Sequence, residues 1–443
     1  MAQDSISPNN PGSGRQSIDT PLILSRPEMI PMRRLAHVAT AIGDSRPAAI
    51  WADNVAGQRR NRSSNSPLNM ANALLGHRFV IGETFGASGD RTDQALARLN
   101  AALATNAGML YIQCGLNDVG QDYPSAATSG ATAFANIKTM AEAARAAGMV
   151  VVIEMEVGSN TVSAAQVQQI VELNARLYEY GEVTPSIYIH DARPAVLQGD
   201  FSATLINYKT GYAYDGVHTN ARGAAYWGES LATLLSAISS PRFGLLPVNR
   251  YELVGVGRRQ MLANANFNSG TGGTLGPGIT GTVPASWLTA KSAAASCAVS
   301  VAPKANGIGN EVTLDCTFTA AGEFARIYQD VASTANWDAG EAYEAIARAR
   351  INGSPSALNR IELRGQSNTT PAGSINFTDG VQDSTWLGPD KAMTLTLLSR
   401  PFIIPALTTK GWLNNEVRVV GSGPGTVSVT IELAALRRRD GGY

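Results

Sequence analysis

Four short segments of the chain contain residue types that together could hydrolyse an ester. Ser45 lies in GDS, Gly89 in GASGDRT, Asn117 in GLND, and Asp215 and His218 in DGVH. Ester hydrolysis needs a nucleophile, a base that takes its proton, a carboxylate that orients the base, and hydrogen-bond donors for the oxyanion. The four segments provide a candidate for each of these roles.

Ser45 is the candidate nucleophile, and His218 is the candidate base because imidazole titrates near neutral pH. Asp215 precedes His218 by three residues, so its carboxylate can reach the other ring nitrogen if the segment turns. Gly89 offers a backbone N–H without a side chain, and Asn117 offers a carboxamide N–H. We therefore predict a catalytic triad of Ser45, Asp215 and His218. We predict an oxyanion hole formed by Ser45, Gly89 and Asn117.

Each of these residues also has a simpler explanation when it is taken alone. Asn and Asp favour turns, so GLND could merely end a strand, and glycine is common in turns. A serine beside glycine is usually a loop residue, and His218 could be a surface side chain. The occurrence of all four segments in one order favours the hydrolase site. The other three histidines, His37, His77 and His190, lie outside these segments and are expected to be structural.

The elements around these residues predict a parallel α/β sheet over residues 35–240. Apolar, strand-like runs alternate with amphipathic helical segments, which is typical of a parallel sheet that helices cover on both faces. The predicted strands are HVATAIGDS, RFVIGETF, MLYIQCG, MVVVIEMEV and SIYIHD, and the predicted helices lie at 67–76, 91–105, 131–148, 163–180 and 221–238. Ligands bind at the carboxyl ends of such strands. Three of the four segments follow a predicted strand, and DGVH precedes the last helix.

The pattern changes after Ser240. Because 443 residues exceed the usual size of a single hydrophobic core, we expect two domains. Residues 241–258 are predicted to be a linker. Residues 259–443 contain short segments rich in Val, Thr, Ile and Tyr, which predict an antiparallel β-sandwich. Residues 1–34 are rich in proline and lack aromatic residues, which is typical of an extended arm.

The composition argues against several classes of partner. Lys plus Arg and Asp plus Glu both number 35, so nothing indicates a nucleic acid. No segment predicts a membrane span, and the N-terminal residues lack the basic and apolar regions of a secretory signal. The three cysteines include no C-x-x-C pair, which gives a zinc site little support. Cys114 is expected to be a buried thiol, and Cys297 and Cys316 could face one another as a disulfide.

The four segments resemble the sequence blocks of the SGNH, or GDSL-type, hydrolase family, and the resemblance covers residues 35–240. SGDRTDQALARL is particularly similar to the second block and its helix. The family's Ser, Gly, Asn, Asp and His match Ser45, Gly89, Asn117, Asp215 and His218. The resemblance implies a flavodoxin-like three-layer α/β/α fold. It also implies an ester hydrolase that needs no metal and no other cofactor.

The chain departs from the family pattern in two places. The residue after the nucleophile is usually apolar but is Arg46 here, and Pro47 follows it. The Asn often found near the start of the second block is missing, with Thr84 or Phe85 in its place. We expect these differences to change the shape of the acyl pocket and the choice of substrate rather than the reaction.

Residues 259–443 resemble jelly-roll carbohydrate-binding modules. NANFNSG is similar to their opening strand, ARIYQDV and GEAYEAIARARI to middle strands, and GPGTVSVTIELAAL to the closing strand. The resemblance implies a polysaccharide or another glycan as substrate. Such modules often carry structural calcium, but the sequence shows no ligand set for it. Aromatic residues could stack on sugars or pack in the core; the candidates are Trp287, Tyr328, Trp337, Trp386 and Trp412.

We therefore predict a serine esterase that removes O-acetyl or similar small acyl groups from a polysaccharide. The alternatives are a lipase, thioesterase or arylesterase of the same family, or a glycan-binding virion protein without catalytic activity. Since all five predicted site residues precede Ser240, we expect the second domain to act only by raising the local concentration of substrate.

The arrangement of arm, esterase and sandwich fits a bacteriophage tail or spike protein. The arm could then support virion assembly or a homo-oligomer. An extracellular or virion-associated location is expected on this interpretation, with a cytoplasmic bacterial enzyme as the alternative.

Overall fold

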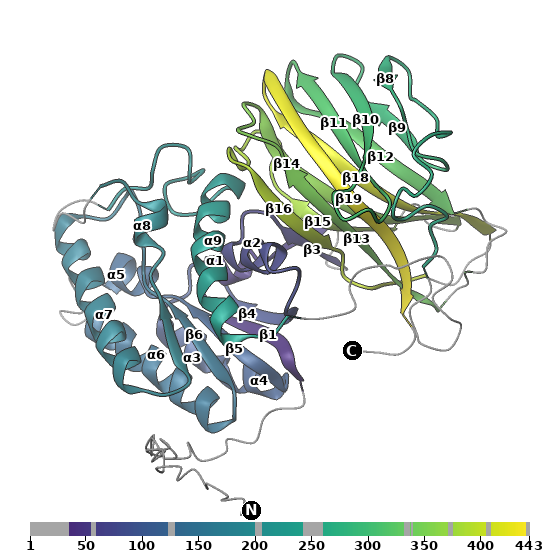
Figure 1. Ribbon diagram of the computed structural model, residues 1–443. Helices are drawn as coiled ribbons and strands as arrows, with labels where there is room; N and C mark the ends of the chain where they lie inside the picture. Colours follow the sequence, from purple (N-terminus) through teal and green to yellow (C-terminus); the bar gives the residue numbers. More distant parts are fainter. Residues whose placement is uncertain are drawn as a thin grey trace, which may run out of the picture.

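The computed structural model describes most of the chain (Figure 1). The described residues are 35–54, 59–122, 129–199, 206–241, 260–331, 337, 340–370, 375–404 and 409–439. The predicted N-terminal arm and residues 242–258 of the predicted linker lie outside them. The described part forms two regions, a parallel sheet covered by helices and a β-sandwich of two sheets.

The first region is built on a five-stranded sheet with the order β4-β1-β5-β6-β7. Its strands are β1 (Leu35–Gly43), β4 (Val80–Gly86), β5 (Ala107–Gln113), β6 (Val150–Glu154) and β7 (Ile187–His190). All neighbouring pairs are parallel. The central strands are buried on both faces, which explains why their sequences are continuous apolar runs. The predicted α/β fold class is confirmed.

Helices cover both faces of this sheet. They are α1 (Ser45–Ala48), α2 (Pro67–Leu74), α3 (Thr92–Ala97), α4 (Leu99–Ala104), α5 (Leu116–Asp122), α6 (Ser129–Ala146), α7 (Ala164–Val183), α8 (Arg193–Val196) and α9 (Ala221–Ile238). One face packs on α3, α4, α6 and α7, and the opposite face packs mainly on α2, α8 and α9. The single helix predicted over 91–105 is divided into α3 and α4 at Arg98.

The second region is an all-β sandwich, as predicted. Its described strands are β8 (Ile279–Gly281), β9 (Leu288–Lys291), β10 (Ser296–Pro303), β11 (Asn310–Phe318), β12 (Ala321–Val331), β13 (Ala342–Ile351), β14 (Leu358–Thr370), β15 (Ile375–Val381), β16 (Met393–Leu398), β17 (Phe402–Ile403), β18 (Thr409–Ser422) and β19 (Gly425–Arg439). One sheet has the order β16-β13-β19-β11-β10-β8, with β17 on β13. Alternate side chains from both sheets form one apolar core.

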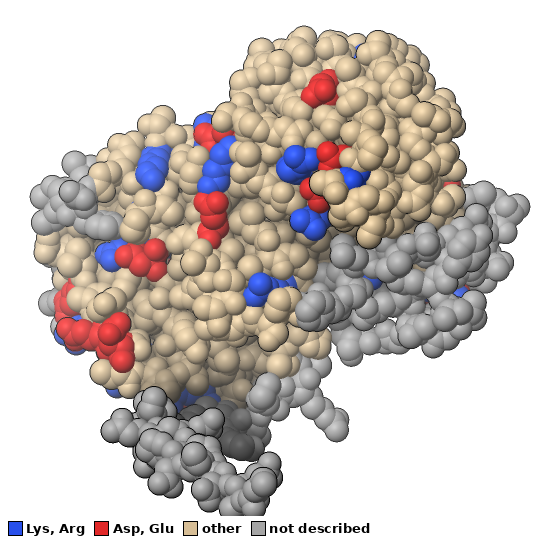
Figure 2. Space-filling model, in the orientation of Figure 1, with Lys and Arg blue, Asp and Glu red and all other residues tan. Residues whose placement is uncertain are grey.

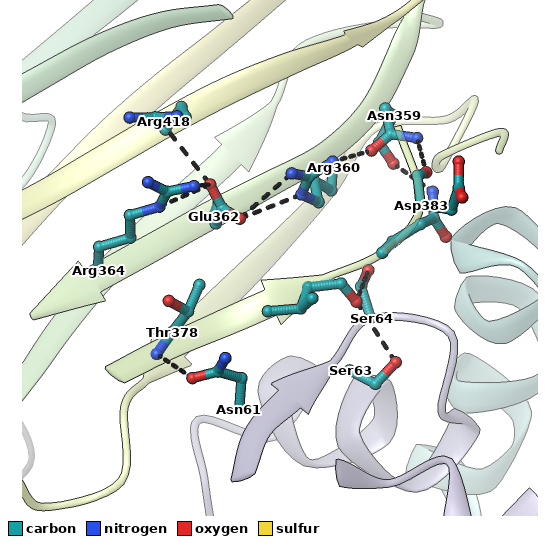
Figure 3. Close-up of polar contacts among 12 residues, drawn as sticks. Asn61, Ser63, Ser64, Asn359, Arg360, Glu362, Arg364, Thr378, Asp383 and Arg418 are labelled. Atoms are coloured by element: carbon teal, nitrogen blue, oxygen red, sulfur yellow. Dashed lines mark hydrogen bonds and ion pairs between the residues drawn. The ribbon is translucent and has the colours of Figure 1, made fainter. Parts of the chain in front are cut away.

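The other sheet of the sandwich includes a hairpin from the first half of the chain. Its order is β2-β3-β15-β14-β18-β12-β9, where β2 (Trp51–Asn54) and β3 (Arg59–Ser63) closely follow the predicted nucleophile. Strand β3 runs parallel to β15, and the Asn61 side chain accepts a hydrogen bond of 3.1 Å from the Thr378 backbone N–H (Figure 3). The predicted hydrolase range, 35–240, therefore contains two strands of the sandwich sheet.

Helix α2 adds a second contact between the two regions. Met70 and Ala73 of α2 belong to the core of the sandwich, whereas Leu68 and Ala71 belong to the core of the α/β region. Figure 1 shows α2 and α9 on the side of the parallel sheet that faces the sandwich. The two regions are thus joined by shared sheet pairing and shared packing, in addition to the chain connection.

Charged side chains of both signs are interspersed on the face shown in Figure 2. This distribution agrees with the equal numbers of basic and acidic residues in the sequence. Among the described residues, none of the helices combines the length and apolar character that crossing a bilayer requires.

The cysteines are buried thiols in this structure. Cys114 lies in the α/β core, as expected. Cys297 and Cys316 occupy directly opposite positions on β10 and β11, with their sulfur atoms 3.6 Å apart. They face one another as predicted, but no disulfide joins them here.

The candidate sugar-stacking residues divide into two groups. Trp287 and Trp337 are fully buried in the sandwich core, so for these two the core-packing alternative is correct. Tyr328, Trp386 and Trp412 are partly exposed.

Candidate active site

The structure brings Ser45, His218 and Asp215 together in the geometry of a catalytic triad. The Oγ of Ser45 lies 2.7 Å from Nε2 of His218, and Nδ1 of His218 lies 2.7 Å from Oδ2 of Asp215. Ser45 is the first residue of α1 and follows the end of β1 after Asp44, so it stands at the carboxyl edge of the parallel sheet. This edge is where open α/β sheets bind their ligands.

A tight turn presents the acid and the base to the serine. Oδ1 of Asp215 accepts hydrogen bonds from the backbone N–H groups of Val217, at 2.9 Å, and of His218, at 2.7 Å. Gly216 has a φ of +80°, a conformation that glycine adopts without strain. Asn220 then starts α9 by accepting a hydrogen bond of 3.1 Å from the backbone N–H of Gly223. The DGVH segment is therefore held between a turn and a helix cap.

The carboxylate of Asp215 is suited to orienting the histidine. Partial burial would raise the pKa of Asp215, but the hydrogen bonds from His218 and from the backbone outweigh burial and lower the pKa below its ordinary value. The group is therefore ionised at neutral pH. An ionised carboxylate fixes the tautomer of His218 and stabilises the imidazolium that forms when the base takes a proton.

The two predicted oxyanion donors follow the strands on either side of β1. Gly89 follows β4 and Asn117 follows β5. Nδ2 of Asn117 donates a hydrogen bond of 2.9 Å to the carbonyl oxygen of Asp90, next to Gly89. A carboxamide has two N–H groups, so this bond orients Asn117 while its second N–H can point to a substrate.

Gly89 has a backbone conformation that few other residues adopt. Its φ is +81°, and a Cβ atom placed on it would meet no other atom within 4 Å. The requirement for glycine therefore comes from the left-handed backbone and not from crowding. Nε2 of Gln121 holds the Gly89 carbonyl at 2.7 Å, which fixes the orientation of this peptide.

Asp118, the neighbour of Asn117, has a structural role. Its buried carboxylate accepts hydrogen bonds from the backbone N–H of Thr92, at 2.9 Å, and from the Thr92 hydroxyl, at 2.6 Å. These bonds tie the start of α3 to α5. Arg98 supports the same loops, because its guanidinium donates to the carbonyls of Gly43 and Phe85, at 3.0 and 3.1 Å.

Arg46 lies in the protein interior, behind the nucleophile. Its Nη1 lies 2.6 Å from Oε1 of Glu156, and its Nη2 donates to the Gly158 carbonyl at 2.9 Å. The charge of Arg46 is therefore held in a buried ion pair, and its expected effect on the acyl pocket stays a prediction. Sequence reasoning missed Glu156, although the acidic residues at the end of the apolar run VVVIEMEV were a signal of polar partners.

Asp44 is a second buried acid beside the nucleophile. Its Oδ1 accepts a hydrogen bond of 2.9 Å from the backbone N–H of Arg46 and so caps α1. Burial raises the pKa of Asp44 to about 7, although the positive charge of Arg46 opposes this shift. The GDS segment thus combines a partly exposed Ser45 with a buried structural carboxyl group at Asp44.

A second set of Ser, His and Glu side chains has the same connectivity but lies inside the α/β region. Nε2 of His190 lies 3.0 Å from Oγ of Ser230, and Nδ1 of His190 lies 2.7 Å from Oε2 of Glu154. Glu154 also accepts hydrogen bonds from Tyr111 and Trp227, at 2.9 and 3.1 Å. These contacts support the structural role expected for His190.

The remaining histidines also lie away from the predicted triad. His77 is buried near Arg62 and Asp379 where the two regions meet. His37 is near the amino end of β1, which is the opposite edge of the sheet from Ser45.

The three-layer fold, with serine, histidine and aspartate at the carboxyl edge of its sheet, defines a hydrolase-type α/β domain. Residues 41–226 match the model of the GDSL-like Lipase/Acylhydrolase family, so the chain carries a domain of this family. A domain of this family implies hydrolysis of ester bonds. No curated protein matches the chain.

Solved structures resemble each region separately. A lipase/acylhydrolase from Enterococcus faecalis is 17% identical, covers 47% of this chain and 100% of its own, and has a TM-score of 0.34. A mutant acetyl-xylooligosaccharide esterase from Geobacillus Stearmophilus is 15% identical, with coverage of 49% and 99% and a TM-score of 0.36. A structure of carbohydrate-binding modules of the β-sandwich superfamily is 15% identical, with coverage of 39% and 60% and a TM-score of 0.26.

Proposed function

We propose that the protein is a serine esterase that removes O-acetyl or similar small acyl groups from a polysaccharide. The observation that carries the esterase part is the hydrogen-bonded chain from Ser45 through His218 to Asp215 at the carboxyl edge of the sheet. The polysaccharide part is supported by the β-sandwich and its resemblance to carbohydrate-binding modules.

In the proposed reaction, His218 takes the proton of the Ser45 hydroxyl as its oxygen attacks the carbonyl carbon of the ester. Asp215 stabilises the imidazolium that forms. Gly89 and Asn117, together with Ser45, donate hydrogen bonds to the oxyanion of the tetrahedral intermediate. His218 then protonates the departing sugar oxygen, which leaves as a free hydroxyl, and the acyl group stays on Ser45. Water, deprotonated by His218, releases this group as a free acid.

The proposed substrate determines where we expect the protein to act. A polysaccharide esterase acts where such polymers occur, either outside the cell or on a virion that trims bacterial surface glycans. The proline-rich residues 1–34 would provide the attachment in the second case. Comparing binding of the full chain and of a chain lacking residues 1–34 to purified virion components would test this attachment.

The esterase proposal is tested with the purified full chain. We expect release of 4-nitrophenol from 4-nitrophenyl acetate and release of acetate from an O-acetylated polysaccharide such as acetylated xylan. A series of 4-nitrophenyl esters of increasing chain length should show a preference for the shortest acyl groups. Preference for long chains would indicate a lipase, and absence of hydrolysis of every ester would indicate a binding protein without catalytic activity.

A further inference from the structure

An aromatic contact links the sandwich to the catalytic histidine. The ring of Tyr214 is nearly parallel to that of His218, with 5.7 Å between centroids and 16° between planes. The ring of Trp386 lies against that of Tyr214, with 3.7 Å between centroids and 7° between planes. Tyr214 belongs to the turn that carries His218, whereas Trp386 belongs to the β15–β16 loop (residues 382–392) of the sandwich.

Hydrogen bonds inside the sandwich fix the conformation of the β15–β16 loop. The buried Nδ2 of Asn359 donates to the carbonyl of Asp383, at 2.8 Å (Figure 3). It also donates to the carbonyl of Trp386. The Gly388 backbone N–H donates to the Leu358 carbonyl at 2.8 Å. A Cβ atom on Gly388 would lie 2.1 Å from the Asn359 carbonyl oxygen, so this close approach requires glycine. Trp386 is therefore held in place before any substrate binds.

The same loop also binds the start of α9, three residues beyond His218. Oε1 of the buried Gln382 accepts a hydrogen bond of 2.6 Å from the backbone N–H of Ala221. The carbonyl of Leu387 accepts a hydrogen bond of 3.1 Å from the Arg222 backbone N–H. Arg222 forms an ion pair of 3.3 Å with Asp390. The loop is thus anchored on both regions, and the ring of Trp386 has a defined position relative to the triad.

The paired rings retain surface that a ligand can reach. Tyr214 is 38% exposed, and Trp386 is partly exposed. Burial and the nearby charge of Asp215 raise the pKa of Tyr214 to about 12, so its hydroxyl is a neutral hydrogen-bond donor. Because Tyr214 and Trp386 cover one face of each other, the surface open to a ligand is an outer face of the pair. A flat apolar face with a polar edge suits a sugar ring, which has C–H groups on its faces and hydroxyls around its rim.

We infer that Tyr214 and Trp386 together form a subsite for the sugar ring that carries the ester, so that the sandwich completes the active site. This inference rests on the proposed esterase function. Stacking of the sugar beside His218 places the ester near Ser45 and limits the orientations of the substrate. Trp386 is then a specificity-determining residue, and the sandwich does more than raise the local concentration of substrate.

The test compares an ester on a sugar with an ester that has none. The probes are methyl glucopyranoside tetraacetate and 4-nitrophenyl acetate, with kcat and KM measured for the full chain and for Trp386→Ala. We expect the variant to reduce the ratio of kcat/KM for the sugar acetate to kcat/KM for 4-nitrophenyl acetate by about tenfold, mainly through KM. Trp386→Tyr, which keeps a flat ring, should recover most of this ratio.

Two control variants separate sugar binding from loosening of the structure. Lys391→Ala removes an ion pair between the loop and Glu229 of α9 but keeps the Trp386 ring and the hydrogen bonds of Gln382, so the ratio should stay close to that of the wild type. Tyr178→Ala removes an aromatic ring that is 57% exposed on α7, and it should change neither rate. The inference is wrong if Trp386→Ala leaves the ratio unchanged, or if it lowers kcat equally on both probes, which would indicate that Trp386 only positions His218.

The inference and the proposed function fail in different ways. Absence of hydrolysis of 4-nitrophenyl acetate by the wild type, or its persistence in Ser45→Ala, would contradict the proposed function. Hydrolysis of 4-nitrophenyl acetate by Ser45 without any turnover of the sugar acetate would contradict the subsite alone.

Discussion

Oγ of Ser45 and Nε2 of His218 lie 2.7 Å apart although 173 positions separate the two residues in the chain. Ser45 is placed by the end of β1, and His218 is placed by the cap of α9. The contact therefore depends on the whole α/β region being assembled. The β15–β16 loop contacts Tyr214 in the turn that carries His218 and binds the start of α9. The β2–β3 hairpin, which follows Ser45 in the chain, pairs with β15. The sandwich therefore contacts segments next to both residues of the Ser45–His218 pair.

Replacing Ser45 by Ala should abolish turnover and leave the fold intact. Loss of the nucleophile in a triad costs on the order of 10⁶ in kcat. Hydrolysis of 4-nitrophenyl acetate measures the loss, and circular dichroism measures folding. Ser230→Ala is the matched control, because Ser230 bonds His190 in the interior, and it should keep near-normal activity. A Ser45→Ala variant with more than about a hundredth of wild-type kcat would exclude Ser45 as the nucleophile.

Glu156→Gln should destabilise the protein because it leaves the buried Arg46 charge without its partner. The side chains of Arg46 and Glu156 are only 6% and 1% exposed. Breaking a buried ion pair from one side typically costs about 3–5 kcal/mol of unfolding free energy. Urea denaturation measures this loss. The surface pair Arg176–Glu172 is the control, and Glu172→Gln should change the unfolding free energy by no more than about 0.5 kcal/mol.

The raised pKa of Asp44 predicts how stability depends on pH. The folded protein binds this proton more tightly than the unfolded chain, because burial raises the pKa of Asp44 from 3.8 to about 7. The contribution of Asp44 to stability is therefore greatest below about pH 4 and falls as pH rises to about 7. Asp44→Asn removes this titration, so the variant should gain stability relative to the wild type between these limits. A stability difference that is the same at pH 4.5 and pH 7.5 would contradict this prediction.

Chelation of divalent metals should leave the chemical step unchanged, because the proposed nucleophile is activated by His218. Incubation with EDTA followed by assay of 4-nitrophenyl acetate hydrolysis measures this. A large loss of activity that a divalent cation restores without refolding would indicate a metal-dependent deacetylase.

Much of the α/β fold and of the site could be predicted from sequence because the signals are local. Apolar runs that end in GDS, GLND or similar segments identify both the strands and the edge where Ser45 and Asn117 lie. The β2–β3 hairpin could not be predicted in this way. Its sequence is rich in Arg and Asn and has no alternating apolar pattern, and its pairing with β15 depends on a distant part of the chain.

The contact between Trp386 and Tyr214 also could not be predicted from the sequence. Trp386 was recognised as a candidate for sugar binding, but nothing local places it beside His218. The expectation that the second domain acts only through the local concentration of substrate stays a prediction, although it did not foresee that the sandwich contacts Tyr214 and the start of α9. The hydrogen bonds of Gln382 and Asn359 determine where the tryptophan lies.

The GLND segment provides the most direct test of the site. Asn117→Ala should fold normally, keep a similar KM and lose roughly 10²–10³ in kcat, which is the usual cost of one oxyanion donor. The effect should fall on kcat because Asn117 binds charge that exists only in the transition state. Asp118→Ala should have the opposite profile, since it leaves the buried Thr92 N–H without its acceptor and costs about 1–3 kcal/mol of stability. Its kcat should fall less than that of Asn117→Ala. Steady-state kinetics and urea denaturation on both variants separate these roles. An Asn117→Ala enzyme with normal kcat beside a folded but inactive Asp118→Ala would show that the carboxylate, and not the carboxamide, acts in catalysis.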